Sequence, residues 1–364
     1  MLISAALTTA LFLAPALPQN EIVLVDGKVI PVKSIQTETY SEVTYKTLNG
    51  GDGRKDASLV REVRHDTGSA VLEDYVTGLE LMDKGDFRNA IQYFQLVLQD
   101  RGASHGRNAW TVQHSWYRIM LCAFADANYS GVVEAADALL QAVPDTFFYG
   151  PALMMKAQAL ALRGDRAGAE SAYRDLAAAV DQKGLPERWA REAELGLVLL
   201  DSSLRGNAKR TKLDQIQARN EREYPTVASR ANVEIGMSYL EEEDLERAEG
   251  FFQRILDQGR ADDMTEAYAW FGLGQVAYKR GLASDDQEAA HELFFQAGLD
   301  FLRVALMYPQ VVQLVPESLC QAAICFHRMG DRESKTKALR IKNKLLERFR
   351  GSPQAKRCEE ELRR

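Results

Sequence analysis

The chain has 364 residues, of which 46% are hydrophobic and 27% charged, and its formal net charge is −7. This acidic balance argues against a general nucleic-acid binder. A compact globule of this length would usually split into two or more domains, whereas a repeat array escapes that limit because each unit buries its apolar face against its neighbours.

The first 18 residues form an uncharged, largely apolar leader that contains Ala14-Pro15-Ala16 near its end. Such a run followed by small residues predicts a secretory signal peptide over residues 1–16, with cleavage after Ala16. No Lys or Arg precedes the run, so an uncleaved anchor and a frayed N-terminus stay open as alternatives. On the first interpretation the protein is exported to the periplasm or another part of the cell envelope.

A module of short strands is predicted over residues 17–66. Residues 21–25 and 28–33 flank a tight turn at Asp26-Gly27, and residues 42–47 and 58–63 extend the strand pattern. The glycine-rich stretch 49–53 is expected to be the loop that joins the last two strands. Because so small a curled sheet or Sm-like barrel is marginal by itself, we expect it to dock on the first helical hairpin.

From residue 71 onward, a recurring dipeptide separates pairs of amphipathic helical patterns. It stands at Gly85-Asp86, Gly164-Asp165 and Gly330-Asp331, with Glu243-Asp244 at the equivalent place in another unit. Glycine can adopt the left-handed conformation that ends one helix, and Asp can accept the free N–H groups that open the next. The pattern predicts hairpins that start near residues 71, 113, 150, 186, 229, 267 and 316, and Ser284-Asp285-Asp286 caps a long helix in the sixth.

Small residues precede and follow each turn at matched offsets, and large residues follow at helical spacing. Residues 231–256 are the best copy, with Gly236 and Ala248 as the small pair and Phe252 and Ile255 after them. This pattern resembles the tetratricopeptide repeat (TPR). The final Phe-Arg-Gly-Ser-Pro, residues 349–353, is similar to repeat ends in bacterial periplasmic and outer-membrane assembly proteins. The resemblance implies a mainly α fold: an α-α superhelical solenoid of about seven TPR-like hairpins over residues 71–364, preceded by the small all-β module.

In the TPR family, ligands usually lie along the concave groove lined by the first helices. Offsets from the turn transfer that groove to this chain, where a bound protein or peptide is expected to contact Tyr75, Leu79, Met82, Met154, Gln158, Arg230, Val233, Met237, Tyr268, Phe271, Gln275 and Tyr278. Aromatic and Arg side chains are the best anchors, which favours the sixth unit. The alternative is that Tyr268 and Phe271 pack against the long inserted helix.

The C-terminal end is basic. Residues 332–364 hold 12 Lys and Arg against 5 Asp and Glu, a local net charge of +7, which leaves −14 on the rest of the chain. A solvated helix face explains this, and a contact with an anionic surface or an acidic partner is the alternative.

Residues with catalytic or metal-binding chemistry form no recognised motif. The five histidines have no i, i+4 pair, and no phosphate loop or nucleophile elbow occurs, so we expect no catalytic residue, no metal site and no cofactor. The four cysteines, Cys122, Cys320, Cys325 and Cys358, are expected to be small buried thiols, with a long-range disulfide left open for an exported protein.

These patterns predict a non-enzymatic protein–protein interaction scaffold of the bacterial cell envelope. A structural subunit of an envelope assembly, which would use its ends or convex face, is the alternative. A cell-wall-acting enzyme is a minor one.

Overall fold

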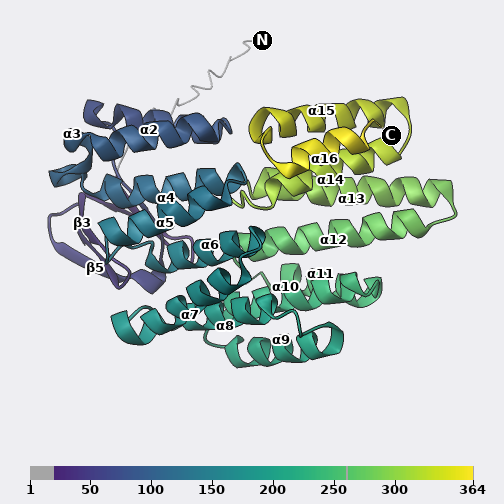
Figure 1. Cartoon of the computed structure of the whole chain (residues 1–364), viewed down its shortest axis with the longest axis horizontal. Coiled ribbons are helices and arrows are strands. Elements are labelled where there is room, and N and C mark those ends of the chain that lie inside the picture. Colours follow the sequence, from purple (N-terminus) through teal and green to yellow (C-terminus); the bar gives the residue numbers. More distant parts are fainter. Residues whose placement is uncertain (1–19, 260, 364) are drawn as a thin grey trace, which may run out of the picture.

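The computed structural model describes residues 20–259 and 261–363 and shows a small β module followed by a curved array of helices (Figure 1). The predicted signal peptide lies outside the described residues. The strands are β1 (Asn20–Leu24), β2 (Val29–Val32), β3 (Ser34–Glu38), β4 (Glu42–Lys46), β5 (Asp52–Asp56) and β6 (Val60–Arg64). They form two antiparallel three-stranded sheets, in the orders β2-β1-β6 and β3-β4-β5. Ile22, Val43, Val60 and Val63 lie in the apolar core of this module.

The loop expected over residues 49–53 is shorter than predicted, because strand β5 begins at Asp52 and was not marked as a strand by the sequence pattern. Its sequence, Asp-Gly-Arg-Lys-Asp, has no apolar side chain, so no hydrophobic alternation marks it as a strand. Pairing with β4 holds it instead, with ion pairs that join Lys46 to Asp52 and Glu42 to Arg54. The Tyr45 ring covers Gly53, where an added Cβ would collide with Tyr45 Cε2.

Seven antiparallel hairpins make up the helical part of the described chain, as the repeat pattern predicts. The paired helices are α1 (Glu73–Asp83) with α2 (Phe87–Gln99), α4 (Trp110–Ala125) with α5 (Tyr129–Ala142), α6 (Tyr149–Leu162) with α7 (Arg166–Lys183), α8 (Arg188–Leu200) with α9 (Gly206–Asn220), α10 (Pro225–Glu241) with α11 (Leu245–Gln258), α12 (Asp263–Ala283) with α13 (Gln287–Met307), and α14 (Val315–Arg328) with α15 (Arg332–Phe349). A short α3 (Arg101–Ser104) joins the first two hairpins, and α16 (Pro353–Glu361) packs on α14. None of these helices is long and apolar enough to cross a membrane.

The turn dipeptide acts as the sequence predicts. Gly85, Gly164 and Gly330 have φ of +79°, +86° and +83°, and the Asp that follows each caps the next helix. Glu243 adopts the same left-handed conformation, with φ of 64°, ahead of the N-cap Asp244. A fifth copy, Ala127-Asn128, has φ of 56° at Ala127 and the same cap geometry, but it contains neither Gly nor Asp and so escapes the pattern.

The small residues let aromatic rings enter between the helices. An added Cβ on Gly78 would lie 2.8 Å from the Phe94 ring, and one on Gly236 would lie 2.7 Å from the Phe252 ring. Both rings are completely buried. The expected long helix of the sixth hairpin is α13, with Asp286 as its N-cap, and its partner α12 is equally long. The extra length is therefore shared between both helices.

The β module docks on the second hairpin and on the loop before α6, so the expected docking on the first hairpin is wrong. A β-bridge joins Thr39 to Thr146, and the Tyr40 N–H donates to the Asp145 carbonyl at 3.1 Å. Gln113 of α4 extends the contact, because its Nε2 donates to the Glu38 carbonyl at 3.5 Å. The β module therefore docks where it forms hydrogen bonds with the α5–α6 loop and with α4, and not on the helix that is nearest in sequence.

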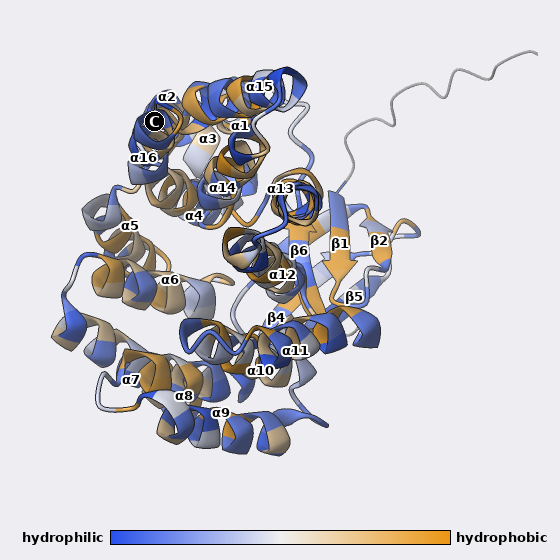
Figure 2. Ribbon diagram, turned by 90° about the vertical axis from the view of Figure 1, so that its right-hand side faces the viewer, coloured by the Kyte–Doolittle hydropathy of each residue, from blue (hydrophilic) through white to orange (hydrophobic). Residues whose placement is uncertain are grey.

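The first and last hairpins of the solenoid touch each other. Phe87 at the start of α2 and Phe349 at the end of α15 have ring centroids 5.5 Å apart, and both belong to one continuous apolar core. A Cβ added to Gly85 would lie 2.7 Å from the Arg348 Cα. Figures 1 and 2 both show α2 beside α15, with the intervening helices curving round. The solenoid therefore closes on itself and surrounds an inner space.

Candidate functional site: the inner cavity and the β-module interface

The inner face of the solenoid is hollowed into a cavity of about 440 Å³. First helices of six hairpins, α4, α6, α8, α10, α12 and α14, contribute to its wall. Five of the predicted groove residues line it: Met154, Gln158, Arg230, Val233 and Tyr268. A contact between these side chains and a partner stays a prediction, but they share one concave surface.

An ion pair crosses the cavity wall from α10 to α8. Arg230 Nη1 donates to Glu192, and the two side chains are only 17% and 10% exposed. Burial alone would lower the pKa of Arg230, but the carboxylates of Glu192 and Asp262 raise it, so the guanidinium stays charged. The same guanidinium lies 3.9 Å from Met154 Sδ on α6, which ties three hairpins together at this point.

Two further polar groups in the wall have raised pKa values. Burial raises the pKa of the Glu234 carboxyl, and the nearby Lys209 and Arg230 offset this only in part. Burial also raises the pKa of the Tyr268 phenol to about 12. At neutral pH the phenol is an uncharged donor, so the wall combines one internal ion pair with hydrogen-bonding groups and apolar surface. That combination suits a peptide backbone with apolar side chains better than a highly charged ligand.

The other predicted groove residues lie outside the cavity wall. Tyr75 is buried against Phe94 and Trp110, and Phe271 packs on Phe301 of the long helix α13 at 5.3 Å between centroids. Tyr278 lies between Phe294 and the guanidinium of Arg328. Leu79, Met82 and Met237 pack against the apolar core, and Gln275 is half-buried. For Phe271 this is the packing against the long inserted helix that the sequence left open as the alternative, and Tyr75 and Tyr278 likewise pack on the second helices of their own hairpins.

A second hollow of about 410 Å³ adjoins the cavity and brings the β module into the site. It shares Met154 and Gln158 with the cavity, and Val25 and Arg61 of the β module form part of its wall. Trp189 also lines it, beneath the guanidinium of Arg188 at 4.6 Å. A segment that ran from the cavity into this hollow would therefore contact the β module as well as the helices.

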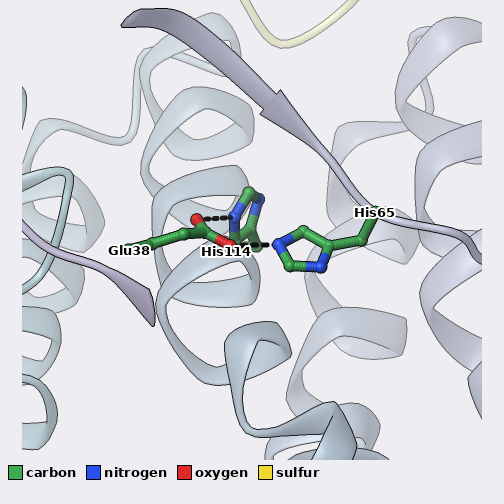
Figure 3. Close-up of side chains that lie close together, drawn as sticks. All are labelled: Glu38, His65 and His114. Carbon is green, nitrogen blue, oxygen red and sulfur yellow. Dashed lines mark hydrogen bonds and ion pairs between the residues drawn. The ribbon is translucent and has the colours of Figure 1, made fainter. Parts of the chain in front are cut away.

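A buried polar cluster of Glu38, His65 and His114 lies where the β module meets the solenoid (Figure 3). Glu38 ends β3, His65 follows β6, and His114 lies on α4. One carboxylate oxygen of Glu38 contacts His65 Nε2, and the other lies 2.9 Å from His114 Nε2. Sequence analysis missed this cluster, because its members stand in three segments and no spacing connects them.

Within the cluster, the pKa of the Glu38 carboxyl and that of the His114 imidazole are both lowered. Burial alone would raise the pKa of Glu38, but the imidazoles of His114 and His65 lower it to about 2. Burial lowers the pKa of His114, more strongly than the Glu38 carboxylate raises it. Trp110 stacks on His65 with 4.0 Å between ring centroids, and Phe148 meets the His114 ring edge-on at 5.0 Å. The aromatic rings of Trp110 and Phe148 thus shield the three polar side chains from water.

The four cysteines are buried and free, as expected. Cys320 and Cys358 nevertheless have interacting thiols, and Arg357 Nη2 donates to Cys320 Sγ at 3.3 Å. The Cys358 thiol, above all, and this guanidinium lower the pKa of Cys320. The sequence did not indicate this contact, because the two cysteines are far apart along the chain. It forms because α16 folds back onto α14.

The hairpins and the inner cavity define a TPR-like helical-repeat protein with an N-terminal β module. No family model matches the sequence, and no curated protein matches it. Among solved structures, the chain is similar to one from the APC/C hetero-tetramer Cut9–Hcn1, with a TM-score of 0.41 and 18% identity over 82% of this chain and 50% of that one. It thus spans about half the length of that chain.

Two other solved structures are similar at lower scores. A tetratricopeptide repeat protein from Parabacteroides merdae gives a TM-score of 0.34 and 15% identity, over 77% of this chain and 100% of that one. The TPR domain of P58(IPK) gives 0.27 and 14%, over 81% and 88%. Because all three scores are low, the assignment of the fold rests on this chain's own hairpins.

Proposed function

We propose that the protein is a non-enzymatic scaffold of the bacterial cell envelope that binds an extended segment of a partner protein inside its solenoid. The observation that carries the proposal is the cavity of about 440 Å³, into which first helices of six hairpins project side chains. A peptide can bury apolar side chains against Met154 and Val233 there and use Gln158 and Tyr268 for hydrogen bonds. The uncharged leader and the repeat ending near residue 353 support the envelope location.

Site-directed photo-crosslinking of the full chain in living cells tests the cavity. A photoreactive amino acid replaces Gln158 or Tyr268 in the wall, and Leu339, which is 50% exposed on α15, provides the matched control position. We expect a discrete adduct from both wall positions and none from position 339. Adducts from position 339 alone would move the contact to the outer face and refute the groove.

Cell fractionation tests the location separately. The proposal expects the protein in the periplasmic or membrane-associated fraction, shortened by the leader. Retention of the full-length chain in the cytosol would refute the envelope location but would not affect the proposal that the protein is a scaffold.

A structural subunit that assembles through its ends or convex face is the second candidate. The basic C-terminal end, with its net charge of +7 over residues 332–364, motivates it and offers a contact for an anionic surface or acidic partner. The mutual contact of the first and last hairpins counts against head-to-tail stacking, because those ends already cover each other. Light scattering decides: a monomer at high concentration contradicts self-assembly.

A cell-wall-acting enzyme is the minor alternative. Such an enzyme needs clustered carboxyl groups with shifted pKa values in an enclosed site. In the described cavity wall the pKa of Glu234 is raised, whereas Glu192 is neutralised by Arg230. The enzyme hypothesis would replace the scaffold hypothesis if the protein hydrolysed cell-wall fragments and Glu234→Gln abolished this activity while partner binding persisted.

A further inference from the structure

The Glu38–His65–His114 cluster has the composition and spacing of a metal site. It offers one carboxylate oxygen and two imidazole nitrogens, and these ligand atoms all lie within 4.8 Å of one another. In a tetrahedral zinc site with bonds of about 2.0 Å, neighbouring ligand atoms lie about 3.3 Å apart. Both histidine contacts of Glu38 are shorter than this, so the two imidazoles would have to move outward to admit an ion.

We infer that Glu38, His65 and His114 form a binding site for a divalent transition-metal ion of the zinc type, which fastens the β module to the helical solenoid. Two imidazoles and one carboxylate are a ligand set found in natural zinc sites, with a water or another small ligand in the fourth position. The set lacks thiolates, and its nitrogen content disfavours calcium and magnesium, which prefer oxygen ligands.

The burial of the cluster suits a metal. The three side chains are only 2–6% exposed, so they lose little further solvation when an ion enters. The stacked Trp110 fixes the His65 ring, as the outer groups around natural metal ligands do.

A cation next to the cluster could oppose a metal ion, and its surroundings offset it. The guanidinium of Arg118 lies close enough to lower the pKa of His114. It is itself bound to the Tyr75 hydroxyl, and the Glu62 carboxylate of β6 also acts on it. The Glu62 carboxylate thus offsets the positive charge of Arg118, and Glu38 is the carboxylate in contact with the two histidines.

A bound ion would join the β module to the solenoid, because its ligands come from both. Glu38 ends β3 and His65 follows β6, both in the β module, whereas His114 lies in the second turn of α4. The other described contacts there are one β-bridge, hydrogen bonds around Gln113 and Thr146, and aromatic contacts such as Tyr40 with Tyr149. Because an ion that binds only the folded chain stabilises it, metal should tighten this junction.

Metal titration of the purified full chain, first stripped with a chelator, tests the inference. We expect one Zn²⁺ per chain in equilibrium dialysis, and a rise of several degrees in the melting temperature on adding Zn²⁺. Co²⁺ should give visible d–d bands of a nitrogen and oxygen site without a near-ultraviolet thiolate band. A thiolate band would place the ion on Cys320 and Cys358 and overturn the assignment, as would a failure to bind either ion.

Variants locate the ion within the chain. Glu38→Gln keeps the shape of the side chain and should abolish the zinc-dependent rise in melting temperature, and His114→Ala should abolish Co²⁺ binding. The control His291→Ala removes an imidazole that is about half exposed and paired only with Asp331, and it should bind Co²⁺ like the wild type. If the cluster variants do not fold, X-ray absorption of zinc-loaded wild-type chain decides, since two imidazole ligands support the site and none refutes it.

Discussion

A substitution at Gly85 measures how much the closure of the solenoid stabilises the protein. Gly85 ends α1 in the left-handed conformation, and the backbone of Arg348, from the last hairpin, lies against it. Gly164 has nearly the same φ at the equivalent turn, but an added Cβ there meets nothing within 4 Å. Gly85→Ala and Gly164→Ala therefore share the conformational penalty and differ in the contact between hairpins.

The expected loss of stability is the sum of the conformational penalty and the penalty for the contact between hairpins. An L-residue in the left-handed conformation costs about 1–2 kcal/mol, and the smaller entropy of the unfolded Ala chain returns about 0.4–1 kcal/mol, so Gly164→Ala should cost about 1 kcal/mol. At Gly85 the Cβ would also lie 2.7 Å from both Cα and Cβ of Arg348. Backbone cannot rotate aside as a side chain can, so overpacking adds about 1–3 kcal/mol. The expected total for Gly85→Ala is about 2–4 kcal/mol.

Urea unfolding followed by circular dichroism gives the free energies, and hydrogen exchange locates the effect. Exchange in α15, more than 240 residues away in sequence, should accelerate in Gly85→Ala and stay unchanged in Gly164→Ala. Equal destabilisation by the two substitutions, with α15 unaffected in both, would show that the first and last hairpins do not meet.

Two further predictions rest on single side chains. Glu243→Gly should stabilise the protein by about 0.5–1 kcal/mol in urea unfolding, because Glu243 has φ of 64° and gives up only an exposed pair with Lys279. A destabilised variant would mean that this pair outweighs the strain. Glu234→Gln should remove a pH dependence: folding raises the pKa of Glu234 above 4.5, so the folded state holds the proton more tightly and wild-type stability falls as pH rises from 4.5 through the folded pKa. Urea midpoints between pH 4.5 and 8 check this, and parallel curves for the two proteins would contradict it.

Local signals in the sequence determined the hairpin architecture. The Gly-Asp turns, the flanking small residues and the large residues at helical spacing all depend on neighbours within about 30 residues, so they predict the hairpins and their capping correctly. The same local rules explain the misses. β5 has no apolar residue, and Ala127-Asn128 lacks the letters of the turn, yet β5 pairs as a strand and Ala127-Asn128 forms the same turn as the other copies.

Only the tertiary structure decided which of these surfaces are exposed and which segments, distant in sequence, contact one another. Small differences in the packing of successive hairpins add up along the array, and no residue pattern encodes their sum. That sum brings Phe87 to Phe349 and encloses the cavity around Arg230. It likewise places His114 against Glu38 and His65, because long-range contacts between separate segments are set by the completed fold and not by spacing along the chain.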